Sequence, residues 1–150
     1  MRVVIQRVQQ ASVTIGGELH SAIGHGLLVL VGVEQGDTDD DARYVASKTA
    51  ALRIFNDDVG VMNRSVVDVD GRVLAVSQFT LTASTRRGNR PSYIRAAGHE
   101  TAVPLYEFFC NEVSRLTGHT VERGVFGADM QVSLVNDGPV TIIIDSHLKD

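Results

Sequence analysis

Short apolar runs separated by turn residues dominate the first third of the chain and predict strands. Residues 3–8 are rich in β-branched side chains, and residues 11–15 alternate between apolar and polar positions. The pair Gly16-Gly17 signals a tight turn, so residues 18–23 are expected to return as the second arm of a hairpin. Residues 26–33 are continuously apolar, which predicts a central strand buried on both faces.

Two segments show helical periodicity instead. After the acidic run 37–41, which supplies a cap, the apolar-facing positions recur at spacings of three and four: Ala42, Val45, Ala46, Thr49 and Leu52. Residues 101–116 carry a second apolar stripe that ends before Gly118, and Pro104 favours a later start of that helix because proline is tolerated only in the first turn. The acidic run lacks the glycine-bounded spacing of a calcium loop, so a solvated first turn is favoured over a metal site.

The remaining segments alternate between strands and turns. Residues 66–69 predict a weak strand, and residues 72–81 begin as a strand and become polar. Residues 130–135 and 140–145 predict two more strands joined by a turn. The resulting order, β-β-β-α-β-β-α-β-β, predicts one mixed α/β domain over residues 1–150, with two main helices on layers of curved mixed sheet.

Composition narrows the class of protein. The 150 residues are 43% hydrophobic and 21% charged, with a mean hydropathy of +0.04, which excludes a disordered chain. The net charge of −4 excludes a chain coated in positive charge but allows a local basic patch. Cys110 is the only cysteine, so neither an internal disulfide nor a cysteine zinc cage is expected. No secretory signal is visible and the longest apolar run, 27–33, is too short to cross a bilayer, so we expect a cytoplasmic protein that does not bind membranes.

The usual catalytic signatures are missing from the sequence. The five histidines form neither HxxxH nor HExxH pairs, so a metal site is not expected, and there is no GxSxG elbow, Walker loop or GxGxxG. Cys110 lies beside Phe108 and Phe109 on the second predicted helix, which favours a buried, inert thiol over a nucleophile. Any catalysis is therefore expected to use less conventional groups.

Two polar segments are candidates for a functional site. In Ser77-Gln78-Phe79-Thr80 an apolar strand ends in two hydroxyls and an amide around one aromatic ring. A strand end is a place where backbone N–H groups can face a ligand, although an ordinary polar terminus would look the same. In Asn136-Asp137-Gly138-Pro139-Val140-Thr141 the Asp-Gly pair lies between two apolar runs and predicts a hairpin, with Pro139 at the start of the next strand.

A basic loop is the third candidate. It carries Arg86, Arg87, Arg90 and Arg95 with Tyr93 among them and no acidic residue. Such a loop could bind phosphates and stack on a base, or it could simply be solvated. The sequence favours neither interpretation.

The motifs SQFTL at residues 77–81 and NDGPVT at residues 136–141 resemble the two signature motifs of the D-aminoacyl-tRNA deacylases, the family first called D-tyrosyl-tRNA deacylases. Further segments resemble the same family: residues 6–13, 26–34, 53–57 and 128–141. The resemblance thus runs nearly end to end, and both motifs in order and correctly spaced are highly specific. Residues 94–104 follow the family less closely, so no catalytic role is carried over there.

The resemblance implies a homodimer without metal or cofactor that hydrolyses the ester between a D-amino acid and the terminal adenosine of tRNA. It also implies action on glycine mischarged on tRNA(Ala), and rejection of L-aminoacyl-tRNA. The Gly138-Pro139 pair is expected to be cis and to enter the pocket that the partner subunit builds around Ser77 to Thr80. Arg7 would orient the Gly-Pro carbonyls, with Asn136 and Thr141 in the same substrate-binding segment. We expect the dimer to form through the sheet side that carries the active site, and we expect no DNA partner.

An activated ester needs only modest catalysis, so main-chain groups are a plausible means. Amide N–H groups of Phe79 and Thr80 at the developing oxyanion would contribute about 3–4 kcal/mol. The 2′-hydroxyl of the adenosine would orient or activate water in place of a protein base. The alternative, a covalent Thr80 nucleophile, has no candidate base nearby in the sequence and ranks second. A non-catalytic tRNA-binding module and a metal-independent esterase for small molecules are the rival functions.

Overall fold

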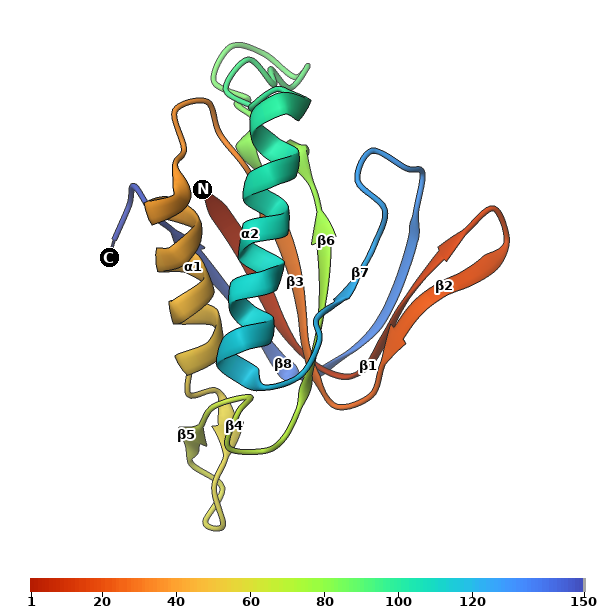
Figure 1. Cartoon of the computed structure of the whole chain (residues 1–150), viewed down its shortest axis with the longest axis vertical. Coiled ribbons are helices and arrows are strands. Elements are labelled where there is room, and N and C mark those ends of the chain that lie inside the picture. The colour runs from red at the N-terminus through yellow and green to blue at the C-terminus, as the bar shows by residue number, and fades with distance from the viewer. Residues whose placement is uncertain (150) are drawn as a thin grey trace.

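The computed structural model describes residues 1–149 and places two helices side by side on one face of a curved mixed sheet (Figure 1). The elements in chain order are β1 (Arg2–Ile15), β2 (Glu18–Ile23), β3 (Gly26–Gly32), α1 (Asp39–Ala51), β4 (Phe55–Asn56), β5 (Met62–Arg64), β6 (Arg72–Ser77), the 3-10 helix η1 (Phe79–Thr82), α2 (His99–Thr117), β7 (Glu122–Arg123) and β8 (Gln131–Asp145). The mixed α/β class with two main helices is therefore confirmed. None of the helices within residues 1–149 combines the length and the apolar character that a membrane span requires.

Strand β1 organises the sheet. It pairs with β3 through residues 2–8 and with β2 through residues 11–15, while β8 runs along its other edge. Beyond β3 the sheet continues with β6 and β7, each parallel to the strand before it. Strand β3 is therefore interior, and Leu27, Leu28 and Val29 are each at most 1% exposed, as the apolar run predicts.

The parallel pair of β3 and β6 requires glycine at its first residue. Gly26 lies opposite Arg72, and a Cβ atom added to this glycine would lie 1.8 Å from the Arg72 carbonyl oxygen. No other residue fits without separating the strands. From this contact the register runs up to Val31 opposite Ser77, where β6 ends.

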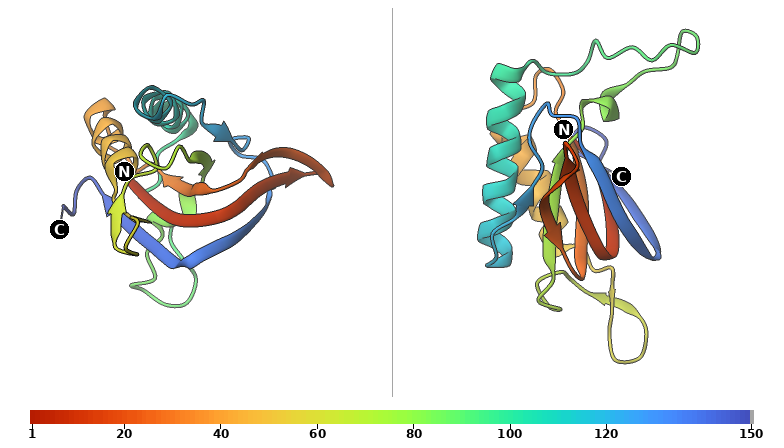
Figure 2. Two further views of the ribbon diagram at one scale, coloured as in Figure 1. Left: turned by 90° about the horizontal axis from the view of Figure 1, so that it is seen from below. Right: turned by 90° about the vertical axis from the view of Figure 1, so that its right-hand side faces the viewer.

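Apolar side chains pack on both faces of the sheet. The larger cluster lies between the sheet and the helices and includes Ile5, Val29 and Phe109. Because successive residues of a strand point to opposite faces, Leu28 belongs to a second cluster, to which the far half of β1 adds Val13. Figure 2 shows the helical layer against one side of the curved strands.

One predicted strand and one predicted helix start are wrong. Residues 66–69 form turns instead of a strand, held by hydrogen bonds in which the N–H groups of Ser65 and Asp68 each donate to the other's side chain. Helix α2 begins at His99, before Pro104 and not after it. Pro104 therefore lies within α2, where its missing N–H removes the hydrogen bond to the Glu100 carbonyl, and the helix continues through it to Thr117.

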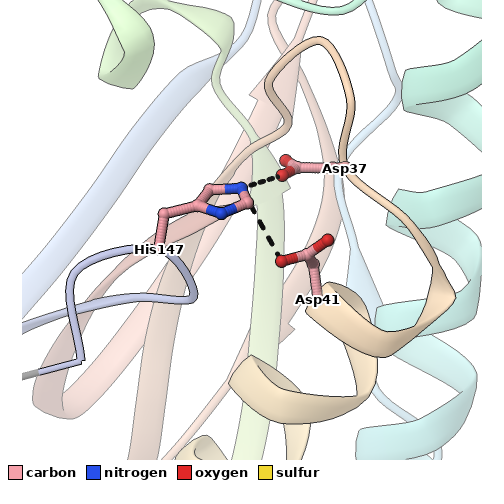
Figure 3. A group of neighbouring side chains, drawn as sticks. All are labelled: Asp37, Asp41 and His147. Carbon is pink, nitrogen blue, oxygen red and sulfur yellow. Dashed lines mark hydrogen bonds and ion pairs between the residues drawn. The ribbon is translucent and has the colours of Figure 1, made fainter.

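The N-terminal ammonium group forms a buried ion pair. It donates to Asp37 Oδ1 at 2.8 Å and to Ser146 Oγ at 2.9 Å, and the side chains of Met1 and Asp37 are fully buried. His147 Nε2 lies 2.7 Å from the same carboxylate oxygen (Figure 3). The first residue of the chain is thereby fixed against the loop before α1 and the segment after β8.

The acidic run therefore divides into two parts. Asp39 and Asp40 are exposed in the first turn of α1, as predicted, and Thr38 with Asp41 forms a capping box. Asp37 precedes the helix and is buried, so the expectation of a solvated side chain is wrong at this residue. Asp37 is buried because it pairs with the Met1 ammonium group, which lies 36 residues away in sequence.

Replacing Asp37 with asparagine would leave the Met1 ammonium buried without a counter-charge. We expect Asp37→Asn to lower the free energy of unfolding by about 3–5 kcal/mol, the usual effect of removing one partner of a buried ion pair. Urea denaturation would measure it. As a control, Asp39→Asn removes the same charge from an exposed helix start and should cost less than about 1 kcal/mol. Equal losses in the two variants would contradict the prediction.

Candidate active site

A pocket of about 980 Å³ opens where β3 and β6 end. Its walls come from these strand ends, from η1, from the start of α2 and from the segment that leads into β8. All four predicted catalytic residues line it: Ser77, Gln78, Phe79 and Thr80. The sequence prediction that these residues lie together in one cavity is thus consistent with the structure.

The backbone turns sharply as it leaves β6. The Gln78 N–H donates to the Val31 carbonyl at 2.8 Å, which extends the pairing with β3 by one residue beyond β6. The Thr82 hydroxyl donates to the Phe79 carbonyl at 2.8 Å. Within residues 1–149 the N–H groups of Phe79 and Thr80 donate to no protein acceptor. The pocket wall therefore contains two adjacent main-chain donors that remain free for a ligand.

The Thr80 hydroxyl is held by an amide and not by a base. Gln78 Nε2 donates to Thr80 Oγ1 at 3.0 Å, and this is the hydroxyl's one hydrogen bond in the described part of the chain. His99 and Asp129 line the same pocket, but neither is hydrogen-bonded to Thr80. The arrangement orients the hydroxyl without removing its proton.

The second predicted segment does not form a hairpin. Residues 131–145 make one long strand, β8, and both of its halves pair with β1 in the same direction. Thr141 lies opposite Gln6 and Asn136 lies opposite Val8, so residues 137–140 face Arg7 alone and bulge out of the ladder. The Asp-Gly signal marks this bulge instead of a chain reversal.

Arg7 and Asn136 fix the shape of the bulge. Arg7 Nε donates to the Asp137 carbonyl at 3.0 Å, and Asn136 Nδ2 donates to the carbonyls of Arg7 at 2.9 Å and of Val140 at 3.0 Å. The Gly138-Pro139 peptide bond is cis, as the family resemblance led us to expect. Gly138 has a φ of +132°, and an added Cβ would lie 3.0 Å from Arg7 Nη2, so only glycine fits here.

Within one chain the two predicted parts of the site, residues 77–80 and residues 136–141, lie apart; we call each of them a half-site. No residue from 136–141 lines the pocket. Its nearest lining residues are Leu134, two residues before Asn136, and Gln6, whose side-chain amide donates to the Thr141 hydroxyl at 3.4 Å. Arg7 pairs with Leu27 at the start of β3, whereas Ser77 pairs with Val31, four residues or about 13 Å farther along. The bulge therefore does not face the pocket of its own chain.

Several pocket residues were not singled out from the sequence. Gln6, His99, Phe126 and Asp129 line the cavity, and the rings of His99 and Phe126 contact edge to face with centroids 5.2 Å apart. They come from three separate segments, so no local pattern connects them. The only sequence signal is that Gln6 and Asp129 fall inside stretches that resemble the family.

Two other candidate groups are chemically occupied or inert. Asp37, Asp41 and His147 bring possible metal ligands within 4.8 Å of one another (Figure 3). The Met1 ammonium, however, already neutralises Asp37. Cys110 is fully buried, and burial raises the pKa of its thiol to about 11. The thiol is therefore protonated at neutral pH, as the prediction of an inert cysteine requires.

Several known proteins are similar to this chain. The family model described as D-Tyr-tRNA(Tyr) deacylase matches residues 4–145. The D-aminoacyl-tRNA deacylases of Porphyromonas gingivalis and Akkermansia muciniphila are 62% and 60% identical to it, over 100% of each chain. The solved structure of the c-Myc DNA Unwinding Element Binding Protein is 40% identical with a TM-score of 0.91, covering 97% of this chain and 98% of its own. That of "a probable eukaryotic D-amino acid tRNA deacylase" shares the fold at 18% identity, with a TM-score of 0.81 and coverage of 96% and 98%.

Proposed function

The chain belongs to the D-Tyr-tRNA(Tyr) deacylase family, and we propose that it hydrolyses the ester between a D-amino acid and the terminal adenosine of tRNA. The observation that carries this proposal is the pair of free amides, Phe79 and Thr80, in the wall of a pocket of about 980 Å³. An ester carbonyl placed against them would develop its negative charge where two fixed donors already point. Glycine esters, including glycine mischarged on tRNA(Ala), are also substrates, because their ester carbonyl can receive the same two donors.

Main-chain donors are well suited to this reaction. Backbone N–H groups anchored at a strand end need no reorganisation as the oxyanion forms, and such donors stabilise the transition state by about 3–4 kcal/mol. Gln78 is tied to Val31, so the two amides that follow are held by the sheet. The protein thus contributes electrostatic stabilisation and position.

The base comes from the substrate. The adenosine 2′-hydroxyl is next to the reacting ester and orients or activates the water. Thr80 Oγ1 accepts a hydrogen bond from Gln78 and, within residues 1–149, is hydrogen-bonded to no basic group that could take its proton. A covalent Thr80 nucleophile is therefore the second choice.

Selection against L-amino acids comes from a second copy of the chain. The Gly138-Pro139 bulge lies outside its own pocket. Among the described residues β8 pairs with β1 alone, and Leu134, Val135 and Ile143 of β8 are exposed. A homodimer formed through this side covers the edge of β8 away from β1 and lets each bulge enter the partner's pocket. Each half-site then completes the other.

The bulge discriminates by shape. Carbonyls of Gly138 and Pro139 receive the substrate's ammonium group and occupy the space that an L side chain would need. A D side chain points away from them, and glycine has no side chain to exclude. Arg7, bonded to the Asp137 carbonyl at 3.0 Å, keeps the bulge rigid enough for a steric barrier.

We expect Thr80→Ala to retain hydrolysis within about tenfold of the wild type, because the amide donor stays and only one side-chain hydrogen bond is lost. Single-turnover assays with D-tyrosyl-tRNA would measure the rate. Complete loss of turnover with intact substrate binding would instead support a covalent Thr80 nucleophile.

A tRNA that ends in 2′-deoxyadenosine should be hydrolysed at least about 100-fold more slowly than the normal substrate, because general-base assistance is lost. The two rates would be compared under single-turnover conditions at equal enzyme saturation. Equal rates would show that the 2′-hydroxyl is not the base.

Pro139→Ala should lower the ratio of D- to L-tyrosyl-tRNA hydrolysis by at least about tenfold, because without the pyrrolidine ring the carbonyls that form the steric barrier are held less rigidly. Pro104→Ala, in α2 and away from the bulge, is the matched control and should keep the ratio. Sedimentation would report the oligomeric state. A monomer that discriminates as well as the wild type would contradict the role of the second copy.

A further inference from the structure

We infer that the loop of residues 85–91, here called the arginine arm, binds the phosphates next to the terminal adenosine of the tRNA. This inference rests on the proposed function, because it takes the aminoacyl ester to lie in the pocket. The arm follows η1 within three residues, and η1 is part of the pocket wall. It carries Arg86, Arg87 and Arg90.

Charge distinguishes this part of the chain from the rest. The whole protein has a net charge of −4, yet residues 71–99 contain no aspartate or glutamate. In residues 1–149, the side chains of Arg86, Arg87 and Arg90 form no hydrogen bond or ion pair, and all three are exposed. Six arginines elsewhere in the described residues pair with acids, and they are Arg2, Arg7, Arg43, Arg64, Arg72 and Arg115. Arg95 and Arg123 form hydrogen bonds to uncharged groups. The arm is thus a cationic element on an acidic protein.

The base of the arm is fixed while its tip is open. Ser84 and Ser92 exchange backbone hydrogen bonds of 2.9 Å, and Arg95 Nη2 donates to the Thr82 carbonyl at 3.1 Å. At the tip, Gly88 has a φ of +93°, and an added Cβ would meet no atom within 4 Å. Figure 2 shows this segment extending away from the sheet and the helices. Its cations are therefore presented to solvent from an anchored position.

The position of the arm fits the nucleotides beside the ester. The rings of Phe79, in the pocket wall, and Tyr93, at the foot of the arm, contact with centroids 5.0 Å apart. Three or four extended residues reach about 12 Å from that foot, so only phosphates near the terminal adenosine come within range. Guanidinium groups match phosphate geometry through paired N–H donors. Exposed rings of Phe79 and Tyr93 between the pocket and the arm offer stacking surfaces for a base.

The test compares two triple variants with equal charge change. Arg86→Gln/Arg87→Gln/Arg90→Gln removes the arm's cations, and Arg43→Gln/Arg64→Gln/Arg115→Gln removes three that pair with acids elsewhere. Each variant is assayed on D-tyrosyl-tRNA and on D-tyrosyl-adenosine, which lacks phosphates. Circular dichroism and unfolding midpoints report whether each variant folds.

For the arm variant, we expect the ratio of kcat/KM on D-tyrosyl-tRNA to that on D-tyrosyl-adenosine to fall at least about tenfold, mainly through KM. The slope of log kcat/KM against log salt concentration on the tRNA should become shallower by about 2, for three contacts to single-stranded phosphates. The control variant should keep both the ratio and the slope.

An unchanged ratio, or an equal fall in both triple variants, would overturn the inference. The inference would also be overturned if the arm variant hydrolysed D-tyrosyl-tRNA at the wild-type rate but no longer bound a DNA duplex. The arm would then be a DNA-binding surface. Failure of the proposed function is distinguishable, since the wild-type protein would then hydrolyse neither ester.

Discussion

The pairing of β1 with both halves of β8 is the constraint on which the second half-site depends. Buried backbone groups must find partners, so the ladder resumes on each side of Arg7 and the surplus residues 137–140 are displaced from it. The displaced carbonyl of Asp137 then takes a donor from Arg7, and Asn136 satisfies two further carbonyls. The Gly138-Pro139 unit is thereby held by the sheet itself, which gives it a precision that a surface loop would lack.

The donor groups of the pocket, like the bulge, are positioned by the sheet. The pocket's distinctive groups are two main-chain amides and a hydroxyl held by Gln78. Such groups do not titrate near neutral pH, so their availability depends on geometry alone. The strand ends that carry them are continuous with the buried interior of the sheet, and the same packing that stabilises the fold positions the donors.

Local patterns predicted those elements whose partners are close in sequence or whose burial is uniform. The continuous apolar run of β3 and the three- and four-residue spacing of α1 were sufficient for this reason. The hairpin at Asp137-Gly138 was wrong because the decisive partner, β1, lies some 130 residues earlier. Asp37 looked solvated because its counter-charge is the chain's own amino group.

In the candidate site, too, contiguous motifs could be predicted from the sequence and residues from distant segments could not. The Ser77–Thr80 and Asn136–Thr141 segments could be named from the sequence because each is a contiguous motif. His99 and Asp129 could not, since only the folded chain brings them into the same cavity. What a single sequence lacks is the distance between such segments, and in this protein that distance is also what suggests a second subunit.

The contact between Gly26 and the Arg72 carbonyl has a further consequence. It lies at the opposite end of two parallel strands from Ser77, yet these strands share one ladder from that end to the pocket. A methyl group added there would push β3 and β6 apart. Because the two strands form one continuous ladder, the resulting rotation of β6 would displace the free amides at its other end. Loss of activity by a mutation at this remote glycine would therefore be a misalignment of donors and not damage to the cavity.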